Sequence, residues 1–177
     1  KFAANRQAIS RLLAQQNPHS SGTLDSLGYA DGYGATQSEV LTYSFLSAYS
    51  GKSPSNNLVD RFPKIPKPNW RVTYDGLSKM KFTQKFLQSL SVSHGYRSVY
   101  SINAFTQDLL YDYKDENPHV RDTVSNFIPQ YTFQQITISE QFAPLFGIDM
   151  TFKNSLQARF EVKRDRTLTL SYANIQV

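Results

Sequence analysis

Apolar and polar residues alternate almost without error along residues 146–153 and again along residues 156–163. A repeat of two indicates β-strands, because successive side chains of a strand point to opposite faces of the sheet. The two segments therefore predict a hairpin with one apolar face and one polar, partly charged face. The apolar positions are Phe146, Ile148, Met150, Phe152, Leu156, Ala158, Phe160 and Val162, and the polar positions are Gly147, Asp149, Thr151, Lys153, Gln157, Arg159, Glu161 and Lys163.

The turn of this hairpin is predicted to be the three-residue loop 153–155. Directly opposite residues must share a face, and this loop pairs Phe152 with Leu156 on the apolar face. It also places Asp149 opposite Arg159, an attractive pair. A loop shifted by one residue would place Asp149 opposite Glu161, a repulsive pair, so we expect the first register.

The first 68 residues predict helices and loops rather than strands. A first helix ends before Pro18, and a turn-rich loop covers residues 22–34. The capping-box sequence of residues 36–39 predicts the start of a second helix, which Gly51 closes. A proline-rich connector follows over residues 53–68. The apolar stripe of the first helix comprises Phe2, Ile9, Leu12 and Leu13.

From residue 69 onward the pattern predicts about six strands. Because strands joined in sequence by modest loops pair as neighbours, we expect an antiparallel meander. The predicted connections are a turn at Asp75-Gly76 with a short helical segment to residue 83, an acidic loop over 108–117, and a turn over 140–144. The predicted strands are 70–74, 86–102, 127–138, the two hairpin strands and a last strand over 167–177.

A sheet with one apolar and one charged face separates two surroundings. These are either a protein core and water, or lipid and a water-filled lumen. The strand over residues 86–102 is longer than the five or six residues usual in a sandwich, and it suits a tall barrel. The alternation by itself fits both a transmembrane β-barrel and a soluble sandwich.

Charge and composition add a further alternative. The chain has 177 residues, a net charge of +5, 14% aromatic residues and no cysteine, which excludes disulfides and cysteine-ligated metals. Basic residues gather over residues 61–85, where they suit either a solvated loop or, with the aromatics, a surface for nucleic acid. Tyrosine and tryptophan also favour the boundary between hydrocarbon and water. The basic residues are Arg61, Lys64, Lys67, Arg71, Lys79, Lys81 and Lys85.

Several long segments resemble the C-terminal region of the SprA/Sov family, the giant outer-membrane translocon of the type IX secretion system, which is also tied to gliding motility. The similar segments are residues 31–34, 48–52, 68–79, 93–98, 126–131 and 138–145, which read DGYG, AYSGK, PNWRVTYDGLSK, SHGYRS, NFIPQY and ISEQFAPL. The resemblance implies a single-chain barrel of about 36 strands that passes folded cargo proteins through the outer membrane of a Gram-negative bacterium, one of the Bacteroidota. It also implies a PorV-like shuttle barrel and a periplasmic plug protein as partners, and no nucleic acid.

The chain begins at Lys1 and stops within a strand pattern, so we expect it to be a fragment of such a translocon. The expected fold class is mainly β: an antiparallel meander forming part of a very large transmembrane β-barrel. Residues 1–68 are expected to form a helical, Pro/Gly-rich cap, plug-like or lumenal segment, and residues 69–177 the barrel wall. The alternative is a soluble β-rich module that binds glycan or nucleic acid through its basic aromatic surface.

In the barrel interpretation, the two faces of the strands receive different roles. Mixed charge on the lumenal face keeps the wall wet and offers passing proteins few apolar contacts. The predicted pore-lining residues are Ser91, Ser93, Arg97, Asp149, Thr151, Lys153, Gln157, Arg159, Glu161 and Lys163. The predicted lipid-facing residues are Leu90, Val92, Tyr96, Phe146, Ile148, Met150, Phe152, Phe160 and Val162.

The search for catalytic chemistry is negative, and we expect neither an enzyme nor a cofactor. His19, His94 and His119 lack ligand spacing and are expected to stand alone. The carboxylates of Asp108, Asp112, Asp115 and Glu116 suit either a solvated loop or a calcium ion, without the spacing of an EF-hand. Residues 31–34 lack the lysine of a phosphate-binding loop. Asp149 and Glu161 lie among basic residues and predict an ion ladder rather than a hydrolytic pair.

Overall fold

The computed structural model describes residues 1–54 and 68–172. They form two compact units, each built from separate stretches of the chain. The sheet unit contains residues 68–101 and 137–169, and the helical unit contains residues 1–54, 102–136 and 170–172. Most of the predicted connector over 53–68, with Arg61, Lys64 and Lys67, and the end of the last predicted strand at 173–177 lie outside the described residues.

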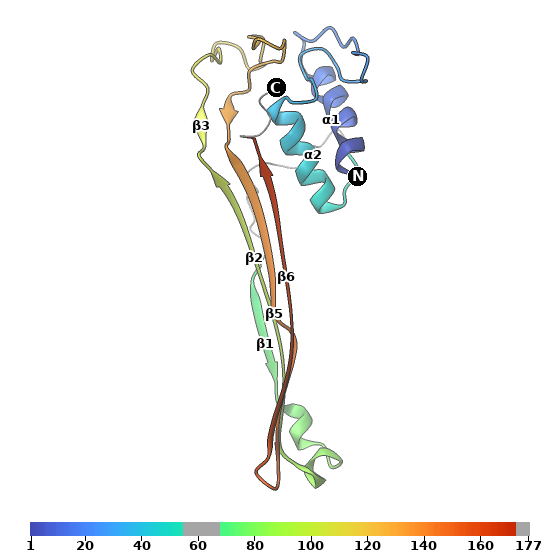
Figure 1. Cartoon of the computed structure of the whole chain (residues 1–177), viewed down its shortest axis with the longest axis vertical. Coiled ribbons are helices and arrows are strands. Elements are labelled where there is room, and N and C mark those ends of the chain that lie inside the picture. The colour runs from blue at the N-terminus through green and yellow to red at the C-terminus, as the bar shows by residue number, and fades with distance from the viewer. Residues whose placement is uncertain (55–67, 173–177) are drawn as a thin grey trace. The chain divides into compact units, whose positions relative to one another are not determined.

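An antiparallel meander forms the sheet unit, as predicted. Its four strands follow the order β1-β2-β5-β6, so each is hydrogen-bonded to its neighbours in that order. Figure 1 shows the long strands β2, β5 and β6 beside one another. The described strands form an open sheet, with β1 and β6 at its edges. Their bounds are Trp70–Tyr74 for β1, Leu87–Asn103 for β2, Gln135–Phe152 for β5 and Gln157–Ser171 for β6.

The hairpin of β5 and β6 has the predicted register. Phe152 N donates a hydrogen bond to Leu156 O at 2.8 Å, and the loop of residues 153–155 reverses the chain. Asp149 and Arg159 form an ion pair across the two strands. The short segment between β1 and β2 also has the predicted helical character, with 3-10 turns η1 (Gly76–Lys79) and η2 (Thr83–Lys85).

The predicted turn over residues 140–144 is wrong, because β5 runs through it without a break. Proline removes a ladder donor, and inside a sheet it is confined to edges and irregular positions. Glycines on both sides give the backbone room around Pro144. A Cβ atom on Gly95 would lie 3.0 Å from Ala143 O, and one on Gly147 would lie 3.0 Å from Pro144 Cγ.

The predicted strand over residues 127–138 is confirmed only in part, and the start of a separate last strand at residue 167 is wrong. β5 begins at Gln135, and β6 continues from Gln157 to Ser171. The charged run 163–166 lies within β6. Arg166 pairs with Glu140 of β5, which keeps the run within the sheet.

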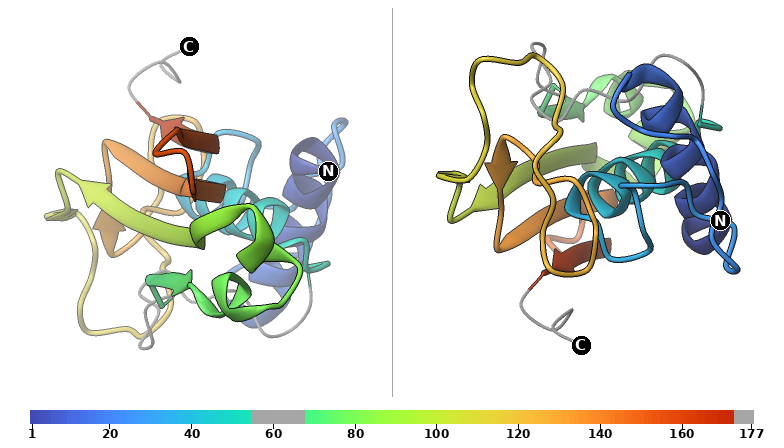
Figure 2. Two further views of the ribbon diagram at one scale, coloured as in Figure 1. Left: turned by 90° about the horizontal axis from the view of Figure 1, so that it is seen from below. Right: turned by 90° about the horizontal axis from the view of Figure 1, so that it is seen from above.

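Two α-helices belong to the helical unit, α1 (Phe2–Gln16) and α2 (Ser38–Ser50), and both views in Figure 2 show them side by side. Gly51 ends α2 in a left-handed conformation, as predicted. The predicted capping box is wrong: Gln37 is the N-cap, and its side-chain oxygen accepts the Val40 N–H at 2.9 Å. None of the helices in residues 1–54 and 68–172 is long and apolar enough to cross a membrane.

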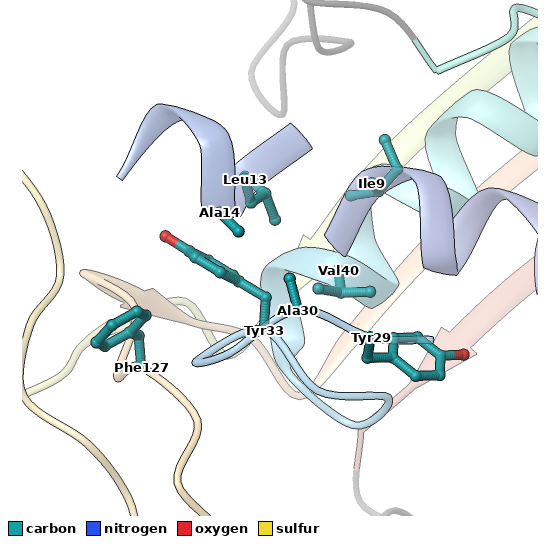
Figure 3. Packing of buried hydrophobic residues seen from close by; sticks show 8 residues of the cluster. All are labelled: Ile9, Leu13, Ala14, Tyr29, Ala30, Tyr33, Val40 and Phe127. Atoms are coloured by element: carbon teal, nitrogen blue, oxygen red, sulfur yellow. The ribbon is translucent and has the colours of Figure 1, made fainter. Parts of the chain in front are cut away.

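The core of the helical unit combines both helices with residues from far along the chain. Phe127 is 2% exposed, and its ring meets Tyr33 edge-on with centroids 5.4 Å apart. Two short strands, β3 (Thr106–Gln107) and β4 (Tyr131–Thr132), pair within the segment that supplies Phe127. Segment 102–136 therefore packs with the N-terminal helices, which the sequence pattern did not indicate. Figure 3 shows the buried cluster, Ile9, Leu13, Ala14, Tyr29, Ala30, Tyr33, Val40 and Phe127.

An ion pair fastens this distant segment to the loop before α2. Asp31 accepts two N–H groups of Arg121, at 2.7 and 2.9 Å, and further bonds from Ser21. The Arg121 guanidinium also lies over the Phe127 ring, 4.4 Å from its centroid. The hydrogen bond from Arg121 holds the pKa of Asp31 well below its usual range, although partial burial opposes the shift.

We expect this pair to make the helical unit less stable in acid. A carboxylate whose pKa is lowered by folding stabilises the fold above its unfolded pKa of about 4 and loses that contribution as the pH falls further. Both side chains are partly exposed, so the effect should be about 1 kcal/mol. Denaturation of wild type and Asp31→Asn from pH 6 to pH 2 checks this. The stability difference should shrink below about pH 4, and a difference independent of pH would contradict the prediction.

Candidate functional site

The four strands of the sheet unit carry one apolar and one polar face. Between β1 and β2, Trp70 lies opposite Tyr96 and Val72 lies opposite His94. Phe142 of β5 extends the same face, since its ring centroid lies 4.9 Å from that of Tyr96 and 6.2 Å from that of His94. Even-numbered residues of the strands therefore share the apolar face, and odd-numbered residues share the polar face.

The apolar face is largely accessible to solvent. Phe160 is 56% exposed and Val162 is 38% exposed. Tyr96 differs from the other predicted lipid-facing residues, because it is 9% exposed and packs between Trp70 and Phe142. The other predicted lipid-facing residues are half-exposed or exposed on this face, namely Leu90, Val92, Phe146, Ile148, Met150, Phe152, Phe160 and Val162.

Aromatic side chains lie at both ends of the apolar face. At one end, Tyr96 lies between Trp70 and Phe142, whose tilted rings have centroids 4.6 and 4.9 Å from its own. At the end where β5 turns into β6, Phe82 and Phe86 meet edge-on and are both exposed. Phe86 O accepts a hydrogen bond from Lys153 N, which fixes this aromatic pair beside the turn.

A row of charges interrupts the apolar face just beyond the first aromatic group, and the same face is apolar again at Ile138 and Leu168. Tyr96 Oη donates to Glu140 Oε1 at 2.9 Å, and Arg166 donates to Glu140 Oε2. Together with Phe142 and Arg164, these two charged residues line one depression in the surface. Glu140, Arg164 and Arg166 were missed in the sequence, because a turn was expected at residue 140. Continuing the even-numbered series through residues 136–142 and 164–170 would have identified them.

The stretch between this charged row and the turn has a defined length. Ten residue steps separate Phe142 from Phe152 on β5, which corresponds to roughly 33 Å along the strand. A strand tilted by about 45° would then cover roughly 23 Å of height, close to the apolar band of about 25 Å on outer-membrane barrels.

On the opposite face, the predicted pore-lining residues have charged and hydroxyl-bearing side chains. Besides Asp149 and Arg159, Lys163 Nζ lies 3.5 Å from Glu161 Oε2 on the same strand. Hydroxyl pairs continue the face along β5 and β6, where the side-chain oxygens of Ser139 and Thr167 are 3.4 Å apart. Lys153 is the exception, because it lies in the turn. The odd positions on β2, β5 and β6 are occupied by Ser91, Ser93, Arg97, Asp149, Thr151, Gln157, Arg159, Glu161 and Lys163.

Within residues 1–54 and 68–172, metal-ligating side chains meet in the helical unit. The expectation that each histidine stands alone is wrong for His19 and His119, which the fold brings together around Asp115. His94 lies on the apolar face of the sheet, with Nδ1 2.7 Å from Leu145 O. Asp108 and Asp112 of the acidic loop each accept a backbone N–H two residues further on, at 3.0 and 2.9 Å.

Neither family models nor curated proteins match this chain. The two faces of the sheet and the cluster in the helical unit are the features of the described residues that bear on function.

Proposed function

We propose that the sheet is part of the wall of an outer-membrane β-barrel, in a protein translocon of the SprA/Sov kind that secretes folded cargo through the type IX system. The proposal rests on one observation: the sheet has an exposed apolar face and, on its other side, a face with ion pairs. A sheet in this arrangement suits lipid on one side and water on the other. Transport would then depend on the shape and wetness of the pore rather than on reactive residues.

The ends of the apolar face support the same proposal. Outer-membrane barrels carry aromatic girdles where hydrocarbon meets headgroups. Trp70, Tyr96 and Phe142 would form one girdle, and Phe82 with Phe86 would contribute to the other. The ion pair of Glu140 and Arg166 would lie just outside the hydrocarbon, where a charged pair is far less costly than at the bilayer centre.

The open edges of the sheet require further strands in lipid. An unpaired backbone N–H or C=O group costs several kcal/mol in hydrocarbon, so β1 and β6 would each pair with another strand of the barrel. Barrels of this kind keep short turns on the periplasmic side. The turn at residues 153–155 would therefore face the periplasm, and the long connection 104–134 would begin on the cell surface. The partners implied by the resemblance are a PorV-like shuttle barrel, a periplasmic plug protein and the cargo.

A soluble module that binds glycan or nucleic acid is the second candidate. One observation favours it: the exposed rings of Phe82 and Phe86 lie in a segment that also contains Lys79, Lys81 and Lys85. Aromatic rings interleaved with basic residues form surfaces on which bases or sugars stack. Such a module would stay soluble without detergent, whereas a protein with a barrel wall would leave the membrane only when detergent is added.

Cysteine labelling tests the two faces directly, because the chain has no cysteine of its own. Single cysteines at Ile148 and Phe160 should react with a lipid-soluble maleimide and resist a charged, membrane-impermeant one. Their neighbours on the other face, Thr151 and Gln157, should show the opposite preference in membranes. Equal reaction of all four positions with the charged reagent would contradict the barrel wall and favour the soluble module.

A further inference from the structure

Two loops of the helical unit bring His19, Asp115 and His119 to one point. His19 Nε2 lies 2.8 Å from Asp115 Oδ2, and His119 Nδ1 lies 3.9 Å from the same oxygen. The two imidazole rings are 5.2 Å apart between centroids. One ligand atom from each of the three side chains lies within 4.8 Å of the others. All three side chains are between 34% and 40% exposed, so the point is accessible from solvent.

A single buried side chain holds the two loops in place. Asn17, 2% exposed at the end of α1, donates to Pro118 O at 2.7 Å and to the Tyr33 hydroxyl at 3.0 Å. Its oxygen accepts the backbone N–H of His19 at 2.9 Å. The Asn17 amide therefore fixes the backbone next to both histidines. The cluster is organised by a buried contact and not by chance proximity of surface side chains.

The carboxylate at the centre is also oriented. Asp115 Oδ1 accepts the backbone N–H of Asn117 at 2.9 Å, which leaves Oδ2 facing the two rings. An aspartate is a carboxylate at neutral pH, as a metal ligand must be.

His119 provides the observation that points to a ligand. Its Nδ1 atom is buried, and it has no hydrogen-bond partner within the described residues. A buried ring nitrogen without a partner is costly. On the other side of the ring, Nε2 lies 3.5 Å from Asp112 Oδ2. A histidine that binds metal through one nitrogen usually directs the other toward such a carboxylate, which orients the ring.

We infer that His19, Asp115 and His119 bind one divalent ion of the late first transition series, with Zn²⁺ as the reference ion and Asp112 orienting His119. Two imidazoles and one carboxylate suit zinc, nickel or copper and do not suit calcium, which prefers oxygen ligands. Tetrahedral zinc needs ligand atoms about 3.3 Å apart. The distances of 2.8 and 3.9 Å to Asp115 Oδ2 lie on either side of that value. The ion would tie the loop after α1 to the segment before Phe127. This site lies wholly in the helical unit and does not depend on the proposed function of the sheet.

The test uses the folded full-length protein, in detergent if it needs one, stripped with a chelator and then titrated with Zn²⁺. We expect one tightly bound zinc per chain by calorimetry and by elemental analysis after gel filtration. His19→Gln and His119→Gln should each weaken binding more than about 100-fold, and Asp112→Asn should weaken it about 10- to 100-fold. The matched controls His94→Gln and Asp108→Asn change the same residue types outside the cluster and should bind zinc like wild type.

X-ray absorption at the zinc edge of the wild-type protein supplies a second readout that needs no variant. It should report two imidazole nitrogens among light-atom ligands, and a spectrum with oxygen ligands alone would overturn the site. Zinc binding unchanged in the His19→Gln/His119→Gln double variant would overturn it too. The same holds for a wild-type protein that retains no zinc, or that retains calcium in preference to zinc.

Discussion

Replacing Ile148 by arginine is expected to destabilise the protein by about 2–4 kcal/mol in a bilayer, if the sheet forms a barrel wall as proposed. Ile148 lies on the apolar face, between the charged row at Glu140 and the turn after Phe152, so it would face lipid near mid-membrane. An arginine there must leave water for hydrocarbon or distort the bilayer to reach the headgroups. Reversible folding into lipid vesicles, followed against denaturant, measures the free-energy change.

Thr151→Arg is the matched control for this substitution. Thr151 lies on the same strand but on the polar face, which already carries Asp149, Arg159 and Lys163. An arginine at Thr151 would remain in water, and the expected change is below about 1 kcal/mol. If both variants folded equally well, the apolar face would not be in contact with lipid. Destabilisation at Ile148 in a protein that stays soluble without lipid would instead indicate a covered, core-forming face.

The sheet was predictable where one rule sufficed. The alternation along residues 146–163 assigns each side chain to a face, and the parity rule then requires a loop with an odd number of residues, as in 153–155 with Phe152 opposite Leu156. Opposite charges at Asp149 and Arg159 select the same register. These contacts join residues near in sequence, so the pattern of one hairpin contains all the information they need.

The errors arose where a local signal competed with its neighbours in space. Pro144 is a turn signal by composition, yet Gly95 on β2 and Gly147 on β5 leave room for the proline within the strand. A separate last strand was expected from Thr167, yet β6 runs through the charged residues 163–166, and Arg166 pairs with Glu140 on the adjacent strand. In both cases the strand is tolerated because of a residue that is distant in sequence or on a neighbouring strand, and the alternation of apolar and polar residues does not reveal that contact.

The helical unit was the least predictable part, because its contacts join residues about a hundred positions apart. Asn17 bonds to Pro118, and Asp31 pairs with Arg121. No periodicity along the chain records such pairings, so the segment from 102 to 136 was expected to form a loop followed by a strand of the sheet. The cluster was missed for the same reason, because His19 lies 96 positions before Asp115; the spacing of four residues between Asp115 and His119 was its one local signal.

Gly32→Ala is expected to destabilise the helical unit by about 3 kcal/mol. Gly32 has a φ of +80°, which costs an alanine about 1–2 kcal/mol. Its Cβ would also overlap the ring of Phe127, the buried aromatic residue that anchors segment 102–136 to the helices. The ring cannot withdraw easily, because Phe127 N donates to Gly32 O at 2.8 Å. Faster amide exchange in α1 and at residues 120–128, together with a lower denaturation midpoint, would measure the loss.

Gly22→Ala separates the backbone effect from the clash. Gly22 has a similar φ of +70°, but a Cβ atom added there would meet no other atom within 4 Å, so the expected loss is about 1 kcal/mol. Combining Gly32→Ala with Phe127→Ala should cost less than the sum of the two single changes, by about 1–3 kcal/mol, because the smaller side chain removes the overlap. Equal effects of the two glycine substitutions, or strict additivity with Phe127→Ala, would mean that the Phe127 ring does not pack against Gly32 in solution.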